Sequence, residues 1–145
     1  MPVLHTLKDL TPEWLTTILR EQGVLTTGQV RSVKVSGTTH QASLNYFLKV
    51  KYSSDAPKNA PKTFFLKLSR PERLPLTASE VEYYTKIVAR TPHKITPICY
   101  SAEFDAATGA YHILLEDVSA THTALSLAYP PTPEHALQMA QTLAR

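Results

Sequence analysis

Five segments of the chain alternate apolar and polar residues in the way that β-strands with one buried face do. The alternation is clearest in residues 44–52, where every even-numbered position is apolar or aromatic. The predicted strands cover residues 30–35, 44–52, 63–69 and 98–104, and a fifth starts at 111 and ends within 116–118. A polar loop at 36–43 and a proline-containing turn at 53–62 separate the first three strands. Consecutive antiparallel strands are therefore the simplest arrangement.

Helical signals surround these strands. Thr11 is a typical N-cap, Pro12 suits the first helical position, and Gly23 is a stop signal. The helix between them has an apolar face made of Trp14, Leu15, Ile18 and Leu19. Such a face predicts packing on the outside of the sheet.

Residues 76–89 predict a second helix, with an apolar arc made of Val81, Tyr83, Tyr84, Ile87 and Val88. A third helix begins at Thr132-Pro133-Glu134, and its stripe is Leu137, Ala140, Leu143 and Ala144. This last helix has no stop signal before Arg145. We therefore expect the chain to be a fragment of something longer.

Two charged residues stand out against this pattern. Lys67 lies inside an apolar strand, and Glu80 falls near the middle of the apolar arc of the second helix. Glu82 lies almost opposite Glu80, and it precedes Lys86 by one turn as an ordinary exposed pair. Because a desolvated ion is costly unless it is paired, a bond between Lys67 and Glu80 explains both placements at once.

Simpler interpretations exist for each of these charges. Lys67 could extend to water from an edge strand, with its aliphatic stem packed on the sheet. Glu80 could complete a capping box, because residues 77–80 fit the Ser/Thr-x-x-Glu pattern. The capping box does not explain why the acid lies in the apolar arc.

Composition narrows the function classes. The chain has 145 residues, 43% hydrophobic and 19% charged, which is typical of one soluble globular domain. The net charge is +3, and the basic residues between Lys49 and Arg73 lie among strand and turn residues. This distribution favours a solvated hairpin over a nucleic-acid surface.

The remaining residue types indicate the compartment and exclude some site chemistries. The single Cys99 predicts a buried thiol. No segment predicts a leader or a membrane span, so we expect a cytoplasmic protein. The histidine spacings predict no metal site, and no nucleophile motif is present.

Three stretches resemble one protein family. Phe65-Leu66-Lys67 is similar to a nucleotide-binding lysine strand, Glu80-Val81-Glu82-Tyr83-Tyr84 to an acid–aliphatic–any–aromatic–tyrosine pattern, and Leu114-Leu115-Glu116-Asp117-Val118-Ser119 to a hinge. In this order they resemble the N-terminal lobe of the aminoglycoside and choline kinase-like phosphotransferases, including the ecdysteroid-kinase-like group. The likeness covers roughly residues 14–145. It implies an α+β, protein-kinase-like lobe with a five-stranded antiparallel sheet and one helix after the third strand.

The resemblance implies a division of the chain and a set of roles. Residues 1–28 would form an N-terminal helical segment, 29–118 the lobe itself, and 119–145 a linker and the first helix of a missing C-terminal lobe. Lys67 would hold the α- and β-phosphates of ATP, and Glu80 would orient it. The segment 36–44 would cover the phosphates. Gly37 is its only glycine, so hydroxyls of Ser43 or Thr39 would substitute for close backbone contacts. Adenine would bind the Glu116 carbonyl and the Val118 N–H, with Leu115 behind it.

The resemblance also implies what this sequence does not contain. Phosphoryl transfer needs an aspartate that accepts the acceptor's proton and ligands for Mg²⁺, and in the family both come from the second lobe. We expect no catalytic residue in this chain, ATP and a small-molecule acceptor as partners of the intact protein, and no nucleic-acid or membrane partner. One alternative is a non-catalytic, pseudokinase-like interaction module. Another is a general α+β ligand-binding domain that takes no nucleotide.

Overall fold

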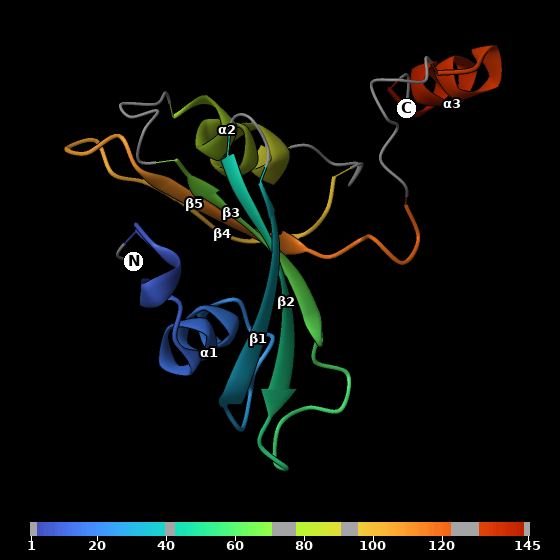
Figure 1. Cartoon of the computed structure of the whole chain (residues 1–145). Helices are drawn as coiled ribbons and strands as arrows, with labels where there is room; N and C mark the ends of the chain where they lie inside the picture. The colour runs from blue at the N-terminus through green and yellow to red at the C-terminus, as the bar shows by residue number, and fades with distance from the viewer. Residues whose placement is uncertain (1–2, 40–42, 71–77, 91–95, 123–130, 144–145) are drawn as a thin grey trace.

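The alternating segments pair into a five-stranded antiparallel sheet with the strand order β1-β2-β3-β5-β4 (Figure 1). The computed structural model describes residues 3–39, 43–70, 78–90, 96–122 and 131–143. The strands are β1 (Val30–Thr39), β2 (Ser43–Tyr52), β3 (Thr63–Ser69), β4 (Cys99–Phe104) and β5 (Tyr111–Glu116). The helices are η1 (Leu7–Asp9), α1 (Pro12–Glu21), α2 (Ser79–Glu82), η3 (Tyr83–Ile87), η4 (Val88–Arg90) and α3 (Pro133–Leu143). The predicted α+β class and five-stranded antiparallel sheet are confirmed.

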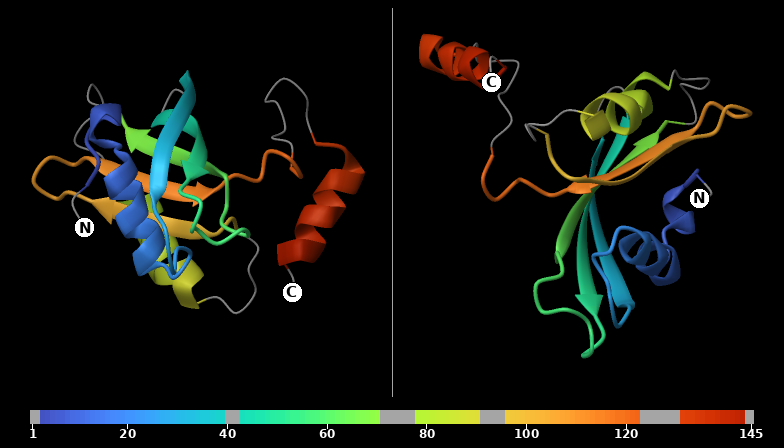
Figure 2. Two further views of the ribbon diagram at one scale, coloured as in Figure 1. Left: turned by 90° about the horizontal axis from the view of Figure 1, so that it is seen from below. Right: turned by 180° about the vertical axis from the view of Figure 1, so that it is seen from behind.

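Helix α1 covers one face of the sheet, as its apolar face predicts (Figure 2). The Thr11 hydroxyl accepts a hydrogen bond from the N–H of Trp14, and Gly23 ends the helix with φ 69°. Fully buried residues from α1, β2, β3 and β5 form the core of this face, which we call the α1 face: Leu15, Ile18, Leu19, Leu48, Phe64, Leu66, Leu68 and Leu114. Thr16 joins helix to sheet, because its buried hydroxyl donates to the Pro12 carbonyl and accepts from the N–H of Val30.

A buried histidine closes the α1 face at its other end. His112 on β5 is fully buried, and its Nδ1 accepts a hydrogen bond of 3.0 Å from the N–H of Leu4. Since Nδ1 is the acceptor, Nε2 carries the proton and donates it to the Ser101 hydroxyl at 2.9 Å. The edge of the imidazole also meets the Trp14 ring at a centroid distance of 5.3 Å. Burial lowers the pKa of His112 to about 4, so the ring is neutral at physiological pH.

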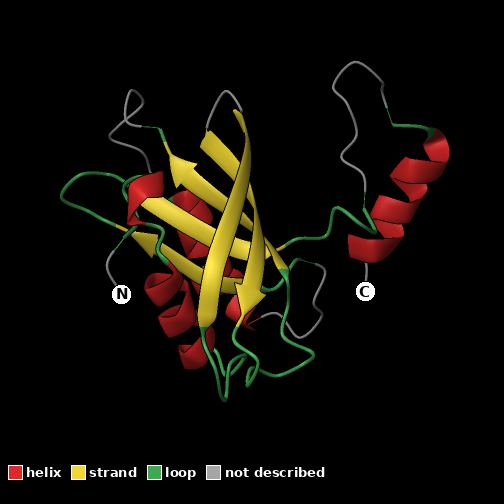
Figure 3. Ribbon diagram, turned by 60° about the horizontal axis from the view of Figure 1, so that its bottom comes forward, coloured by secondary structure: helices red, strands yellow, loops and turns green. Residues whose placement is uncertain are grey.

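The opposite face is covered by α2 and the helical turns that follow it, and we call it the α2 face (Figure 3). Its buried apolar set is small and consists of Val81, Tyr111, Ile113 and Leu115. Phe65 and Phe47 pack at its border, with ring centroids 5.3 Å apart. Cys99 is half-buried there, and burial raises the pKa of its thiol to about 11.

The hairpin between β1 and β2 is longer than the sequence predicts. The expected loop at 36–43 is wrong for 36–39 and 43, because β1 extends to Thr39 and β2 begins at Ser43. Gly37 pairs with Tyr46 and Thr39 with Leu44 in the ladder. Cross-strand pairing with the aromatic and aliphatic residues of β2 therefore outweighs the turn preference of Ser36 and Gly37. Residues 40–42 lie outside the described residues.

The second helix also departs from the prediction. It begins at Ser79 among the described residues, and residues 76 and 77 of the expected helix lie outside them. After four α-helical residues the chain widens into the π-helical turn η3, in which the N–H of Val88 bonds to the Tyr83 carbonyl, and then tightens into the 3₁₀ turn η4. A π turn rotates less per residue than an α turn, so the positions after Glu82 shift around the axis. The expected arc is therefore wrong for Tyr83 and Ile87, which are 37% and 57% exposed.

Helix α3 begins at the predicted residue, but its predicted apolar stripe does not pack against the sheet. Thr132 caps it through the N–H of His135. The helix stands away from the sheet in Figure 1, and Leu137 and Met139 are exposed. The expected stripe is thus solvent-exposed at Leu137 and Ala140, while the side chains of 143 and 144 lie outside the described residues. None of the helices formed by the described residues is long and apolar enough to cross a membrane.

Candidate functional site

Lys67 lies on the central strand of the sheet. Its strand β3 is paired on both sides, and Lys67 is opposite Asn45 of β2 and Ile113 of β5. The interpretation of Lys67 as a residue extending from an edge strand is therefore wrong. Because β3 is a central strand, the ammonium can reach water or a partner only above the α2 face.

Lys67 and Glu80 form a close ion pair. Lys67 Nζ lies 2.8 Å from Glu80 Oε1 and 2.6 Å from Glu80 Oε2, so the ammonium contacts both carboxylate oxygens. The side chains are 22% and 40% exposed, respectively. The pairing predicted from the sequence is confirmed, but the pair is half-buried and Glu80 does not point into a closed core. The three N–H groups of an ammonium leave Lys67 able to donate to a ligand as well.

The start of the helix leaves the Glu80 carboxylate available for Lys67. Ala78 is the N-cap of α2, and no side-chain hydrogen bond caps this helix. Thr77, the cap that the capping-box interpretation requires, lies outside the described residues. Glu82, two positions later, points to solvent and pairs with Lys86 at 2.6 Å, as predicted.

The negative charge of Glu80 affects the pKa values of two nearby tyrosines, Tyr84 and Tyr111. Burial and, second to it, the negative charge of Glu80 raise the pKa of Tyr84 to about 12. The same two causes raise the pKa of Tyr111 above its usual range. Both phenols therefore stay protonated at neutral pH. The site combines one cation and one anion with neutral hydroxyl groups.

Other predicted site residues share this face. Paired residues of neighbouring strands point to the same side of a sheet, and Leu115 pairs with Phe65, two positions from Lys67. Leu115 is buried on the α2 face with Phe65 beside it. An apolar shelf of these two residues thus lies next to the ammonium of Lys67.

Ser43 and Gly37, predicted to cover the phosphates, both lie in paired strands of the β1–β2 hairpin. Ser43 is 2% exposed, lies in β2, and donates its hydroxyl to Asn45 Oδ1 at 2.9 Å. Gly37 lies in β1, where an added Cβ would be 2.8 Å from the Tyr46 ring. The backbone of Thr39 ends β1, and the structure describes nothing of its side chain.

The predicted hinge lies where β5 ends. Glu116 is the last residue of β5 and pairs with Phe64, and its N–H and carboxylate both bond to the backbone of Ile98. Val118 follows outside the strand, and its carbonyl accepts from the N–H groups of Thr121 and His122. Within the described residues, the N–H of Val118 has no hydrogen-bond acceptor.

Sequence reasoning missed two features that depend on register rather than on local pattern. Asn45 lies opposite Lys67 in the ladder, so its polar side chain is on the α2 face beside the ammonium-bearing strand position. The His112 network joins residues of β4, β5 and the N-terminal segment. The only sequence signal for His112 is an imidazole at an alternating position in a buried strand.

The clearest hollows among the described residues lie away from Lys67. One of about 310 Å³ is lined by Tyr100 and Ile98 together with residues of the α1 and β3 ends. A second, of about 240 Å³, follows the outer strand β4 between Ile18 and Tyr84. The Lys67–Glu80 pair lines neither of these two hollows.

The described residues contain no cluster of three or more His, Cys, Asp or Glu that could hold a metal ion. Comparisons with known proteins give no relative: no family model, no curated protein and no solved structure matches this chain.

Proposed function

We propose that this chain is the nucleotide-binding, N-terminal lobe of an ATP-dependent kinase that transfers phosphate to a hydroxyl of a small molecule. The observation that carries the proposal is the contact of Lys67 with both oxygens of Glu80, on the central strand and the next helix. The five-stranded antiparallel sheet and the helix after β3 support the proposal, because the lobe that the sequence resembles has both features.

The residues present suit a nucleotide. Lys67 supplies a positive charge for the α- and β-phosphates, and Glu80 holds that charge in one position. Phe65 and Leu115 offer an apolar surface for adenine, and the Val118 N–H offers a donor. The phosphate cover would come from the tip of the β1–β2 hairpin, whose residues 40–42 lie outside the described part of the chain.

ATP would arrive with Mg²⁺, which neutralises phosphate charge during transfer. No His-x-Asp sequence occurs in this chain, and the residues described hold no metal cluster. The proposed role of this chain is therefore binding and orientation of the nucleotide, with proton transfer and metal ligation supplied from elsewhere. We expect this chain alone to show no phosphotransfer, and measurable turnover in a phosphate-release assay would contradict that expectation.

Calorimetric titration with Mg·ATP tests the proposal. We expect binding to the chain that is weakened at least about tenfold in Lys67→Ala, because a charged hydrogen bond to phosphate is lost. Glu80→Gln should weaken binding less, because the ammonium remains but loses its fixed position. Lys86→Ala is the matched control, since Lys86 belongs to the exposed pair on the same helix. Equal affinity in Lys67→Ala and Lys86→Ala would exclude Lys67 as a nucleotide ligand.

A non-catalytic interaction module is the alternative, and the exposed Tyr83 and Ile87 in the helical turn that follows α2 favour it. The coding sequence that follows Arg145 separates the two functions. A continuing frame with a His-x-Asp loop supports the kinase, and a stop codon supports the module.

A further inference from the structure

The outer edge of β4 carries a separate inference. In the strand order β1-β2-β3-β5-β4 this strand is the last one, so among the described residues it pairs with β5 alone. The N–H of Asp105 donates to the Ala110 carbonyl, which makes these two residues a hydrogen-bonded pair of the hairpin. Such pairs recur at every second residue, so Glu103 also bonds to β5, while Ala102 and Phe104 direct their N–H and carbonyl groups away from it. Backbone groups directed outward in this way are the template to which a further strand adds.

A groove follows this edge. Its hollow has a volume of about 240 Å³. The lining comes from the end of α1, from η3 and from β4 itself: Ile18, Glu21, Gln22, Tyr84, Thr85, Cys99, Tyr100, Ser101, Ala102 and Glu103. Because α1 and η3 cover opposite faces of the sheet, the strand edge lies between two helical walls (Figure 2).

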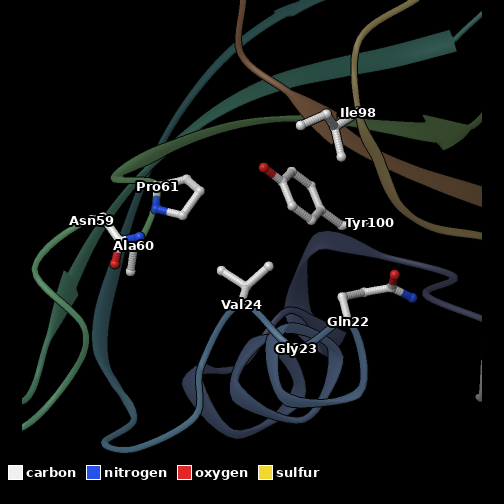
Figure 4. A pocket seen from close by; sticks show the side chains of 8 residues that line it. All are labelled: Gln22, Gly23, Val24, Asn59, Ala60, Pro61, Ile98 and Tyr100. Carbon is white, nitrogen blue, oxygen red and sulfur yellow. The ribbon is translucent and has the colours of Figure 1, made fainter. Parts of the chain in front are cut away.

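The groove is long rather than compact. Gln22 and Tyr100 also line the neighbouring hollow of about 310 Å³, which Figure 4 shows between the end of α1 and the start of β4. The six residues of β4 alone extend over about 20 Å. An extended chain suits such a groove better than a small molecule does.

The groove is negatively charged on its α1 side. Glu103 pairs with His112, so its side chain lies on the α1 face, and Glu21 lines the same hollow. Within the described residues, Glu21 has no ion-pair partner and no Lys, Arg or His lines the groove. Glu21 is also the last residue of α1, where the negative end of the helix dipole disfavours an acid. A charge placed against the helix dipole points to a role other than stability, and here it favours a cation.

The other side of the groove is apolar. Ala102 pairs with Ile113 on the α2 face, and Tyr84 of η3 packs on the same cluster. Side chains of a strand alternate between the two faces of a sheet. An added strand would therefore place every second side chain beside Glu103 and the others beside Ala102 and Tyr84.

We propose that the outer edge of β4 docks an extended segment of a partner protein, in which basic residues alternate with apolar ones, as a sixth, antiparallel strand. Its basic side chains lie beside Glu21 and Glu103, and its backbone bonds to Ala102 and Phe104. A second copy of this chain pairing through the same edge is disfavoured, because it would bring the acids of both copies together. The edge is separated from Lys67 by β5, so the docking site stands independently of the proposed nucleotide function.

Short peptides test the backbone pairing. In acetyl-Val-Lys-Val-Lys-Val-amide, valines opposite Ala102 and Phe104 direct their N–H groups to β4, and the lysines direct theirs away. In the ¹⁵N-labelled full chain we expect saturable NMR shifts of these two amides, with Kd on the order of 100 µM, and slower hydrogen exchange of both. Methylating the backbone nitrogens of two valines should weaken binding at least about tenfold, because hydrogen bonds to β4 are lost. Methylating those of the two lysines is the matched control and should have little effect.

The variant Glu21→Lys tests the charge. A lysine suits the C-terminal end of α1 better than an acid does, so the fold should be retained. We expect the variant to bind the lysine peptide about 3- to 10-fold more weakly at low salt. It should gain affinity for acetyl-Val-Glu-Val-Glu-Val-amide, which should not bind the native chain. Glu134→Lys makes the same change of net charge on α3 and should alter neither peptide.

Three results would overturn the proposal. One is equal affinity of the two methylated peptides, and another is equal affinity of the lysine and glutamate peptides for the native chain. The third is a shift of the Ala102 and Phe104 amides with rising protein concentration and no peptide, because a second copy would then occupy the edge.

Discussion

On the α1 face of the sheet, a helix and the N-terminal segment cover a broad apolar layer, and the one histidine within it is neutral and doubly hydrogen-bonded. On the α2 face, a short helix covers a small apolar cluster, and an ion pair stays partly in water. The strand β3 contributes to both, with Phe64, Leu66 and Leu68 on one side and Phe65 and Lys67 on the other. If the proposed function holds, neighbouring residues of one strand serve stability and binding separately. Stability and binding should therefore respond to different substitutions.

The largest effect is expected from Phe64→Ala. Phe64 is fully buried on the α1 face, and truncating it leaves a cavity that should cost about 3–5 kcal/mol of unfolding free energy. Phe65→Ala, one position along on the α2 face, should cost no more than half as much because Phe65 is only half-buried. Urea unfolding measures both. Equal losses would mean that the two faces contribute alike to stability.

Mild acid should weaken the α1 face through His112. Its pKa falls from 6.5 to about 4 on folding, so between these values the unfolded chain binds the extra proton. The stabilisation is complete above pH 6.5 and is lost as the pH falls toward 4. Between pH 7 and pH 5 we expect a loss of about 2 kcal/mol. The lowered pKa values of Asp9, Asp55 and Asp105 act below this window.

The control for this pH dependence is another histidine. His112→Gln should be less stable at pH 7 but should lack the slope, whereas His135→Gln, altered on the exposed helix α3, should retain it. Urea unfolding at both pH values measures the slope. A slope that survives in His112→Gln would assign it to other groups.

Thr16→Val tests the attachment of α1 to the sheet. The substitution keeps the shape but leaves the N–H of Val30 without its acceptor, which should cost about 1–2 kcal/mol. Thr17→Val is the control, because the exposed Thr17 hydroxyl bonds only to Glu13 of its own helix. Thermal unfolding of the pair compares them. If Thr17→Val were the more damaging, helix propensity and not the helix–sheet bond would dominate.

The smallest effect on stability is expected from Lys67→Ala. A pair with exposed fractions of 22% and 40% is screened by water, so its loss should cost about 1 kcal/mol or less. The same substitution should strongly reduce nucleotide affinity if the proposed function holds. A stability loss above about 3 kcal/mol would show that the pair is structural rather than a ligand site.

Local signals in the sequence account for much of this structure. The Thr11 cap and Gly23 stop define α1, and strict alternation defines β2 and β3. The Lys67–Glu80 pair was predictable because each charge lies in an apolar pattern, and pairing the two offsets the desolvation of both. The order of the strands in the sheet was harder to predict from the sequence, and this order places Lys67 on a central strand.

The errors arose where non-local contacts or backbone irregularity overrode local preference. Ser36 and Gly37 extend β1 because β2 pairs with them. Tyr83 and Ile87 are exposed because the π turn rotates the helix, and the residues themselves carry no signal for that turn. Tyr100 was an ordinary alternating aromatic residue in the sequence. Its position in the lining of a hollow is evident only when the ends of α1, β3 and β4 meet.

The bond between Leu4 and His112 has a consequence for how the chain is made. The two residues are 108 positions apart, so the N-terminal segment leaves the ribosome long before its acceptor exists. At roughly 5–20 residues per second, that interval is on the order of ten seconds. During this interval Trp14 of α1 lacks its contact with His112, because β5 has not been translated. The N-terminal segment can therefore bind to His112 only after β5 has been translated, which makes this contact a late event in biosynthesis.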